Sequence, residues 1–228
     1  MENYPEIATE RFDKANFHIK YCLSLVKNYI KGDVLEVGAG CGSFTRNYEK
    51  ATNGSITLTE LDEKNLFILK KNFKENTRIK VFKDGQTEIG AKYDTILYFH
   101  VLEHIENDTK ELEKAKKMLN RNGHLIIMAP AHQKIYSNLD KAVGHFRRYE
   151  KSFFSKDLFG LEQKKLILID SIGYVLYFLN KTFFKNEVFP SDFKIFIWDK
   201  IFTPFTIIVD FLTIYKFGKC FISIYKKN

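Results

Sequence analysis

The sequence predicts an α/β fold in which helices cover both faces of a parallel sheet. Short apolar strands alternate with amphipathic helices between residues 34 and 130, and this alternation is typical of parallel sheets. A glycine-rich turn follows the first of these strands. The chain has 228 residues, 45% of them hydrophobic, which suffices for the core of one large domain. We therefore expect a single domain over residues 1–228.

The first half of the chain, residues 1–130, supplies most of the elements. Apolar residues at three- and four-residue spacing predict an amphipathic helix over residues 10–30, which the polar turn Lys31-Gly32-Asp33 ends. Apolar runs between turn signals, the last of them after Asn122-Gly123, predict strands at residues 34–37, 55–59, 79–82, 93–99 and 125–128. The helices between them are expected in a stretch that ends at residue 50, at residues 63–73, and at residues 108–119 with Asp108 near the N-cap.

The second half, residues 131–228, begins with a loop and continues with a helix near 152–161 and strands at 165–169 and 217–225. The two strands are separated by residues 170–216, which is far more than a hairpin needs. In this aromatic insertion, Thr203 and Pro204 fit a helix N-cap and first helical position. A narrow polar stripe follows from Asp199, Thr203, Thr206, Asp210 and Thr213. Three placements stay open: a helix packed on the core, a membrane-surface or partner-binding helix, and a transmembrane helix.

Charge is distributed unevenly along the chain. Residues 1–130 carry 20 Lys+Arg against 19 Asp+Glu, net +1, and residues 131–228 carry 16 against 9, net +7. The second half also holds 15 of the 22 Phe residues and the single Trp198. There is no dense Lys/Arg helix, so we expect no nucleic-acid partner. A basic, aromatic second half instead favours an anionic or membrane-associated small-molecule acceptor.

Cysteine usage and the N-terminus point to the cytoplasm, with membrane association through the insertion as an open option. The three cysteines, Cys22, Cys41 and Cys220, lack the spacing of a zinc site or a disulfide framework. The first residues are acidic and polar where a secretion signal would be basic and then apolar. We expect a monomer or dimer without a bound metal.

The turn Gly38-Ala39-Gly40-Cys41-Gly42 lets the backbone approach a ligand, and the helix after it offers free N–H donors. A turn without ligand is the simplest alternative. The dinucleotide pattern G-x-G-x-x-G of an oxidoreductase does not fit, because it would place its third glycine at Ser43.

With its strand, acidic residue and G-x-G-x-G turn, the chain resembles the class I S-adenosylmethionine-dependent methyltransferases. Residues 93–105 look like the fourth-strand motif of the small-molecule branch, of the methyltransferase type 11/12 kind. The resemblance implies a Rossmann-like, doubly wound sheet of seven strands with the last one antiparallel. It implies that Glu60 holds both ribose hydroxyls, that Asp84 lies near the adenine and that Glu36 helps the amino group. The cofactor-binding residues that it implies are Glu36, Gly38, Ala39, Gly40, Gly42, Glu60, Leu61, Asp84, Gly85, Phe99 and His100.

Two other function classes compete for these residues. His100-Val-Leu-Glu103-His104 also spells H-x-x-E-H, the inverted zinc-metallopeptidase signature, which requires both histidines on one helical face. Here an apolar strand leads directly into His100, so we favour the methyltransferase. A non-catalytic module that binds a nucleotide or cofactor is the other alternative.

Candidate acceptor residues cluster after the fifth strand, in residues 129–149. This stretch resembles the P…Y…D…GH.RRY segment of a bacterial methyltransferase subfamily. Methyl transfer to a hydroxyl needs a base, and the candidates are His100, His132 and His145. Two adjacent arginines before an aromatic residue suit an anionic group on a small-molecule, sugar or lipid-linked acceptor. The candidate substrate residues are Tyr136, Arg147, Arg148 and Tyr149. Internal ion pairs are the alternative for both arginines.

Overall fold

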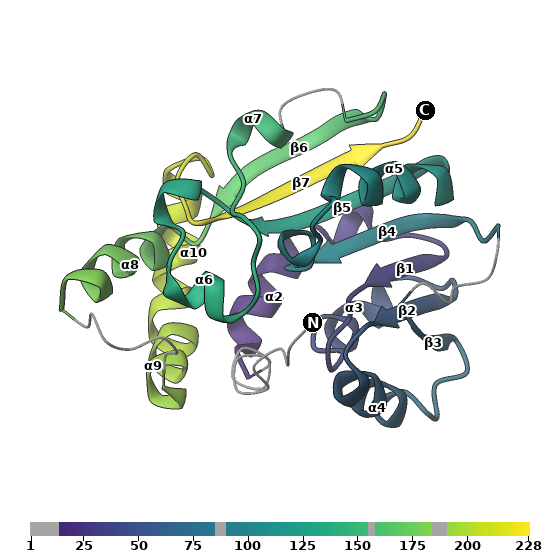
Figure 1. Ribbon diagram of the computed structural model, residues 1–228, viewed down its shortest axis with the longest axis horizontal. Helices are drawn as coiled ribbons and strands as arrows, with labels where there is room; N and C mark the ends of the chain where they lie inside the picture. The colour runs from purple at the N-terminus through teal and green to yellow at the C-terminus, as the bar shows by residue number, and fades with distance from the viewer. Residues whose placement is uncertain (1–13, 85–89, 155–157, 184–190) are drawn as a thin grey trace.

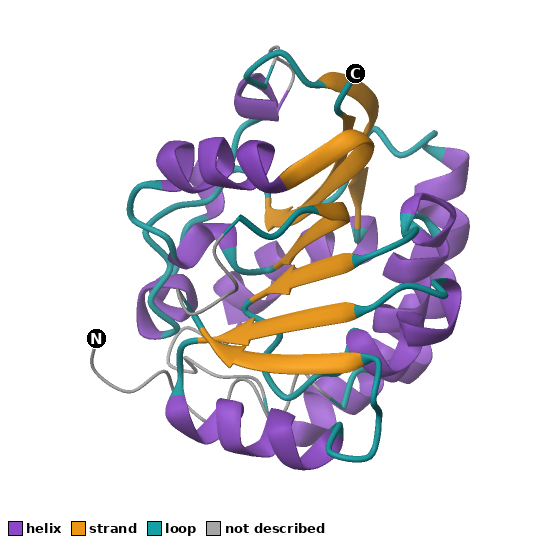
Figure 2. Cartoon of the chain, turned by 90° about the vertical axis from the view of Figure 1, so that its right-hand side faces the viewer, coloured by secondary structure: helices purple, strands orange, loops and turns teal. Residues whose placement is uncertain are grey.

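The computed structural model describes residues 14–84, 90–154, 158–183 and 191–228. A seven-stranded sheet with the order β3-β2-β1-β4-β5-β7-β6 forms its central layer, and helices lie on both faces (Figure 2). The strands are β1 (Val34–Val37), β2 (Ile56–Glu60), β3 (Ile79–Lys83), β4 (Tyr93–Phe99), β5 (Leu119–Pro130), β6 (Glu162–Ile169) and β7 (Cys220–Lys226). Neighbours from β3 to β5 pair in parallel, and β7 is antiparallel to both β5 and β6. The fold class and the antiparallel last strand are thereby confirmed.

The helices and the core follow from the alternation of apolar side chains. The α-helices are α2 (Asn16–Ser24), α3 (Thr45–Tyr48), α4 (Glu63–Asn72), α5 (Asp108–Met118), α6 (Asn138–Ala142), α7 (Lys151–Phe154), α8 (Ser171–Phe183), α9 (Asp192–Ile197) and α10 (Thr203–Leu212). Successive residues of a strand point to opposite faces. Val34 accordingly joins one buried cluster, with α2, and Leu35 joins the other, with α5. The core therefore has two layers, one on each face of the sheet.

The N-terminal helix is shorter than predicted. Residues 10–13 lie outside the described residues, and α2 ends at Ser24 instead of continuing to Ile30. The Ser24 hydroxyl donates to the Tyr21 carbonyl at 2.6 Å, and Leu25 and Val26 bond to carbonyls only three residues back. Serine that competes for helix carbonyls in this way weakens the α-helical ladder. A short 3-10 turn, Lys27–Tyr29, completes the segment.

Two further predictions from the sequence were wrong, the start of the fifth strand and the helix at residues 152–161. Strand β5 begins at Leu119, so Asn122 and Gly123 form an irregularity inside the strand. The Asn122 amide there donates to the Lys227 carbonyl at 2.6 Å. The helix predicted at 152–161 is only α7, and residues 155–157 lie outside the described part. Leu158 and Leu161 instead form an isolated antiparallel bridge before β6.

The insertion between β6 and β7 lies beyond the carboxyl ends of the parallel strands, at the left in Figure 1. From α9 the chain passes through a π-helical segment, Trp198–Phe202, directly into α10. The N-cap prediction for Thr203 is therefore wrong: Phe202 and Thr203 both have helical backbone angles, and the Thr203 hydroxyl donates to the Trp198 carbonyl. No helix in the described part of the chain is long and apolar enough to span a membrane.

Candidate functional site

The glycine turn connects β1 to α3 at the point where the strand order reverses, because β2 and β4 flank β1 on either side. Ligands of open α/β sheets bind at this position. Gly38, Gly40 and Gly42 all have positive φ, between 56° and 84°. A Cβ on Gly38 would lie 2.6 Å from the Val101 side chain, and one on Gly42 would lie 2.4 Å from Phe73. Only glycine therefore fits at positions 38 and 42. Ala39, between the first two glycines of the turn, is buried.

Glu60, the last residue of β2, turns its carboxylate toward this glycine turn. One oxygen accepts from the Gly40 amide at 2.7 Å, and the other accepts from the amides of Leu61 and Asp62 at 2.9 Å. Burial raises the pKa of Glu60, and the three backbone donors oppose that shift. The carboxylate is thus oriented by the backbone beside the glycine turn, and it retains acceptor capacity.

Glu36 is buried in the middle of this site. Its Oε2 accepts from the hydroxyls of Thr45 at 2.6 Å and Tyr48 at 2.7 Å. Burial is the largest influence and raises the pKa of Glu36 to about 7, although both hydroxyls lower it. Thr45 and Tyr48 belong to α3, so this carboxyl group ties the helix to β1.

The raised pKa makes stability depend on pH. The native carboxyl holds its proton up to about pH 7, whereas an unfolded Glu loses it near pH 4.5. We therefore expect the free energy of unfolding to fall by about 3 kcal/mol from this group as the pH rises from 4.5 to 8. Urea unfolding at several pH values should show this slope in the parent protein, and Glu36→Gln should remove it. The exposed Glu63→Gln is the control and should retain it; equal slopes in all three proteins would refute the assignment.

The remaining residues implied for the cofactor lie at neighbouring strand ends. Asp84 is exposed after β3, and its amide donates to the Glu60 carbonyl at 3.0 Å. Leu61 is 50% exposed beside it. Phe99, the last residue of β4, is buried and stacks on Phe44 with ring centroids 4.6 Å apart. Gly85 lies outside the described residues.

His100 follows β4 directly, with φ at 57°, a conformation that non-glycine residues adopt rarely. Its side chain is 39% exposed, and its Nδ1 lies 3.6 Å from an oxygen of the buried Glu103. The ring of His145 approaches the same carboxylate at 3.8 Å through Nε2. Burial raises the pKa of Glu103, but His100 and His145 outweigh it and the pKa is lowered, so the carboxylate is ionised.

The zinc-peptidase interpretation of this motif is wrong. Leu102–His104 form a 3-10 turn and His100 precedes it in a left-handed conformation, so the two histidines do not share a helical face. Glu103, His104 and His145 do place ligand atoms within 4.8 Å of one another, a set able to hold a metal ion. His104 also packs edge-on against His145 at 4.6 Å.

Asp140 organises the loop after β5. It is 1% exposed, and one of its oxygens accepts from His145 Nδ1 and Arg148 Nε, both at 2.8 Å. Its other oxygen accepts from the amide and hydroxyl of Ser137. Both ring nitrogens of His145 therefore face carboxylates, and Arg148 is already paired inside the protein.

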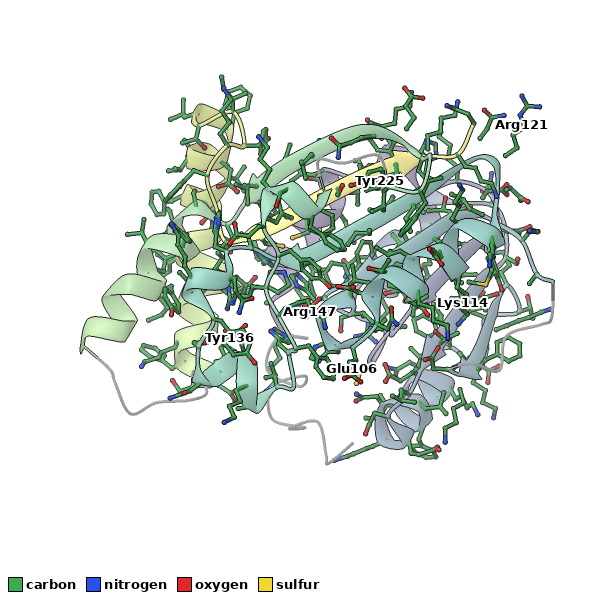
Figure 3. The ribbon with its side chains drawn as sticks, turned by 45° about the horizontal axis from the view of Figure 1, so that its top comes forward. Glu106, Lys114, Arg121, Tyr136, Arg147 and Tyr225 are labelled. Atoms are coloured by element: carbon green, nitrogen blue, oxygen red, sulfur yellow. The ribbon has the colours of Figure 1, made fainter. Side chains whose placement is uncertain are left out.

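The other substrate candidates also bond within the protein. Arg147 pairs with Asp108 at 2.8 Å and donates to the Ile105 carbonyl. It also donates to the carbonyl of Glu106, which is labelled near it in Figure 3. Tyr149 is buried, and its hydroxyl lies 2.9 Å from the Asp108 carboxylate and 3.1 Å from the Leu102 carbonyl, to one of which it donates. Tyr136 donates to the His145 carbonyl at 2.6 Å. The structure thus supports the internal-pairing alternative for both arginines, and these side chains hold the loop against η3 (Leu102–His104) and α5.

His132 has φ at 66°, and its Nε2 lies 3.0 Å from the Gly218 carbonyl. Its ring packs on Tyr174 of α8 at 5.2 Å. This third candidate base therefore connects the loop to the insertion.

The sequence did not indicate a cluster of buried polar and aromatic side chains that forms between α2 and the insertion. The ring of His18 packs against Trp198 with ring centroids 4.5 Å apart, and its amide donates to the Asp199 carboxylate. Burial, opposed by Asp170, lowers the pKa of His18 to about 4, so the ring is neutral. Lys219 pairs with Asp170 at 3.1 Å and lies over the Trp198 ring. Because these residues are far apart in sequence, no local pattern indicates their contact.

A sheet of this order with a glycine turn after β1 and an acidic residue at the end of β2 is typical of the class I S-adenosylmethionine-dependent methyltransferases. The family model described as a methyltransferase domain matches residues 12–157, and the chain belongs to that family. Its cofactor is S-adenosylmethionine.

Other proteins resemble this chain in sequence or in fold. The chain is 27% identical over 192 residues to an uncharacterized protein, MJ1123, of Methanocaldococcus jannaschii, covering 82% of this chain and 86% of the relative. Among solved structures, the N-methyltransferase NodS from Bradyrhizobium japonicum in complex with S-adenosylhomocysteine has a TM-score of 0.60 at 13% identity, covering 99% and 93% of the two chains. Phosphoethanolamine N-methyltransferase 2 of Haemonchus contortus, in complex with S-adenosylmethionine, has a TM-score of 0.60 at 11% identity and covers 90% and 51%. At such identities the structures establish the shared fold.

Proposed function

We propose that the protein transfers a methyl group from S-adenosylmethionine to an anionic small-molecule acceptor, of the sugar or lipid-linked kind. The observation that carries this proposal is the position of His100, between the glycine turn and the loop of the basic second half. In this proposal Glu60 binds the ribose hydroxyls, Asp84 lies near the adenine, and Glu36 supports the turn that faces the methionine part.

The chemistry is a one-step displacement. A lone pair of the acceptor attacks the methyl carbon in line with the carbon–sulfur bond, which breaks and leaves S-adenosylhomocysteine. An acceptor hydroxyl or amine must lose its proton. His100 is the proposed base because its ring is the most exposed of the three candidate histidines, with side-chain exposures of 39%, 20% and 15% for His100, His132 and His145. Burial lowers the pKa of His100, but Cys220 and Glu103 outweigh it and raise this pKa to about 10. The ring therefore acts as a base only after it has lost its own proton, and turnover should rise as the pH rises toward 10. His132 and His145 are then positioning residues.

The test is the release of S-adenosylhomocysteine with separate lipid and polar-metabolite extracts of the source cells as acceptor. We expect His100→Ala to lower the turnover about 100-fold or more, because a general base contributes that much. Binding of S-adenosylmethionine in calorimetry should change less than about threefold. His124→Ala is a matched control, because His124 pairs with Thr95 near the start of β4, away from the carboxyl ends of the strands, and lines a surface cavity with Lys31 and Arg121.

Unchanged turnover in His100→Ala would exclude this histidine as the base. Transfer to a neutral, water-soluble acceptor that is insensitive to salt would contradict the anionic acceptor.

A further inference from the structure

The helical segment 192–212 of the insertion turns its polar side inward. Asp199, Thr203, Thr206 and Asp210 of the polar stripe are all at most 1% exposed. Asp210 accepts from the Tyr21 hydroxyl at 2.7 Å and from the amides of Asp170 and Ser171 at 2.8 and 3.0 Å. Asp199 accepts from the His18 amide at 2.9 Å. Hydrogen bonds to α2 and to the start of α8 thus fix which side of the helix faces the protein.

The opposite side of the segment is apolar and faces solvent. Between Ile195 and Tyr215 every exposed residue is apolar. Together with Phe193 they form what we call the apolar face: Phe193, Phe196, Ile201, Pro204, Phe205, Ile207, Ile208, Phe211, Leu212 and Ile214. Phe205, Phe211 and Leu212 are 57%, 67% and 71% exposed. A contiguous apolar surface of this kind marks an interaction site.

The charges at the border of the apolar face are mainly positive. In residues 192–217 the charged residues that are exposed or half-buried are Asp192 and three lysines, Lys194, Lys200 and Lys216. Lys14 lies 3.4 Å from Asp192, which leaves Lys194 and Lys216 as the excess positive charge. Lys200 pairs with the buried Asp199 at 3.0 Å and lies over the ring of the half-exposed Phe17, 4.2 Å from its centre. If two copies of the chain paired through this face, the same border would lie on both sides of the interface, and its lysines would repel one another. A negatively charged lipid surface attracts all of them.

We propose that the apolar face docks the protein on a lipid bilayer that contains anionic lipids. The Phe, Ile and Leu side chains enter the boundary between headgroups and acyl chains, and the lysines remain at the headgroups. The insertion lies beyond the carboxyl ends of the parallel strands, on the side of the cofactor turn (Figure 1). Docking therefore brings the site to the membrane and, resting on the proposed function, makes the acceptor a membrane-borne lipid with an anionic headgroup.

Co-sedimentation of the full-length protein with vesicles tests this. We expect binding to vesicles of phosphatidylcholine with about 30% phosphatidylglycerol, and weaker binding to pure phosphatidylcholine. Each change of an exposed Phe to Ser should lower partitioning about tenfold, so Phe205→Ser with Phe211→Ser should lower it about 100-fold. Phe67→Ser is the matched control, because Phe67 is 70% exposed on α4, away from the insertion.

Substitution of lysines measures how much their charge contributes to vesicle binding, separately from the apolar side chains. Lys14→Gln with Lys216→Gln should lower binding to the anionic vesicles by about tenfold or more and leave binding to neutral vesicles unchanged. Lys70→Gln with Lys71→Gln on α4 should have little effect on either.

Calorimetric binding of S-adenosylmethionine, measured on every variant, shows that the site is intact and keeps this result independent of methyl transfer. Failure to bind anionic vesicles would overturn the proposal. So would a dimer in light scattering that Phe205→Ser with Phe211→Ser converts to a monomer, because the face would then cover a second copy.

Discussion

Replacement of Glu60 by Gln is expected to weaken the binding of S-adenosylmethionine about 100-fold. The carboxylate accepts from the amides of Gly40, Leu61 and Asp62, and in the proposed complex it also accepts from two ribose hydroxyls. The glutamine amide keeps one acceptor oxygen, but its NH2 group replaces the other oxygen and faces groups that are themselves hydrogen-bond donors. Loss of charge-assisted bonds at a site built for a diol has effects of this size.

Calorimetric titration with S-adenosylmethionine measures this effect. Glu63→Gln is the control, since Glu63 lies three residues further on and its side chain is 71% exposed. The affinity of this variant for S-adenosylmethionine should equal that of the parent protein. A change of less than threefold in Glu60→Gln would show that this residue does not hold the ribose.

Replacement of Asp140 by Asn is expected to lower the free energy of unfolding by about 3 to 5 kcal/mol, as removal of one partner from a buried ion pair does. It leaves Arg148 and His145, with side chains only 10% and 15% exposed, without their shared carboxylate. Turnover should fall as well, because the loop 131–149 loses the group that orients His145.

The same residue determines part of the response to acid. Burial would raise the pKa of Asp140, but hydrogen bonds from His145 and Arg148 hold it well below its usual range. A carboxyl group whose native pKa is depressed stabilises the fold above its unfolded pKa near 4, and this contribution is lost as the pH falls below that value. Urea unfolding between pH 3 and 7 should therefore show a smaller acid loss in Asp140→Asn than in the parent protein.

Asp192→Asn, which removes an exposed carboxylate, is the control and should change neither the stability at pH 7 nor the acid response. Equal stability of Asp140→Asn and the parent at pH 7 would mean that Asp140 does not hold the loop.

Much of the sheet could be predicted because buried parallel strands are continuous apolar runs. Strands β1 and β4 begin and end as predicted, at residues 34–37 and 93–99. The helix ends were less predictable. Ser24 ends α2 through a hydrogen bond to Tyr21, and Thr203 lies within a helical run that passes through a π segment. Such bonds depend on backbone geometry that periodicity does not contain.

The candidate site shows the same division. The spacing of Gly38, Gly40 and Gly42 and the place of Glu60 after an apolar strand indicate a cofactor site without any structure, because the whole signal lies within short segments. The acidic partners of Arg147 and Arg148 cannot be found from local spacing. Arg147 pairs with Asp108, 39 residues away, so a motif that suggests anion binding serves loop packing.

Local spacing was sufficient for the α/β class, the glycine turn and the acidic residue at the end of the second strand, since each is encoded by neighbours in the chain. It also revealed one polar and one apolar side in the insertion. Which side faces the protein was decided by contacts such as that of Tyr21 with Asp210, across 189 residues. Only the folded chain brings these groups together, and for that reason only the tertiary structure shows that the apolar side is the one that faces solvent.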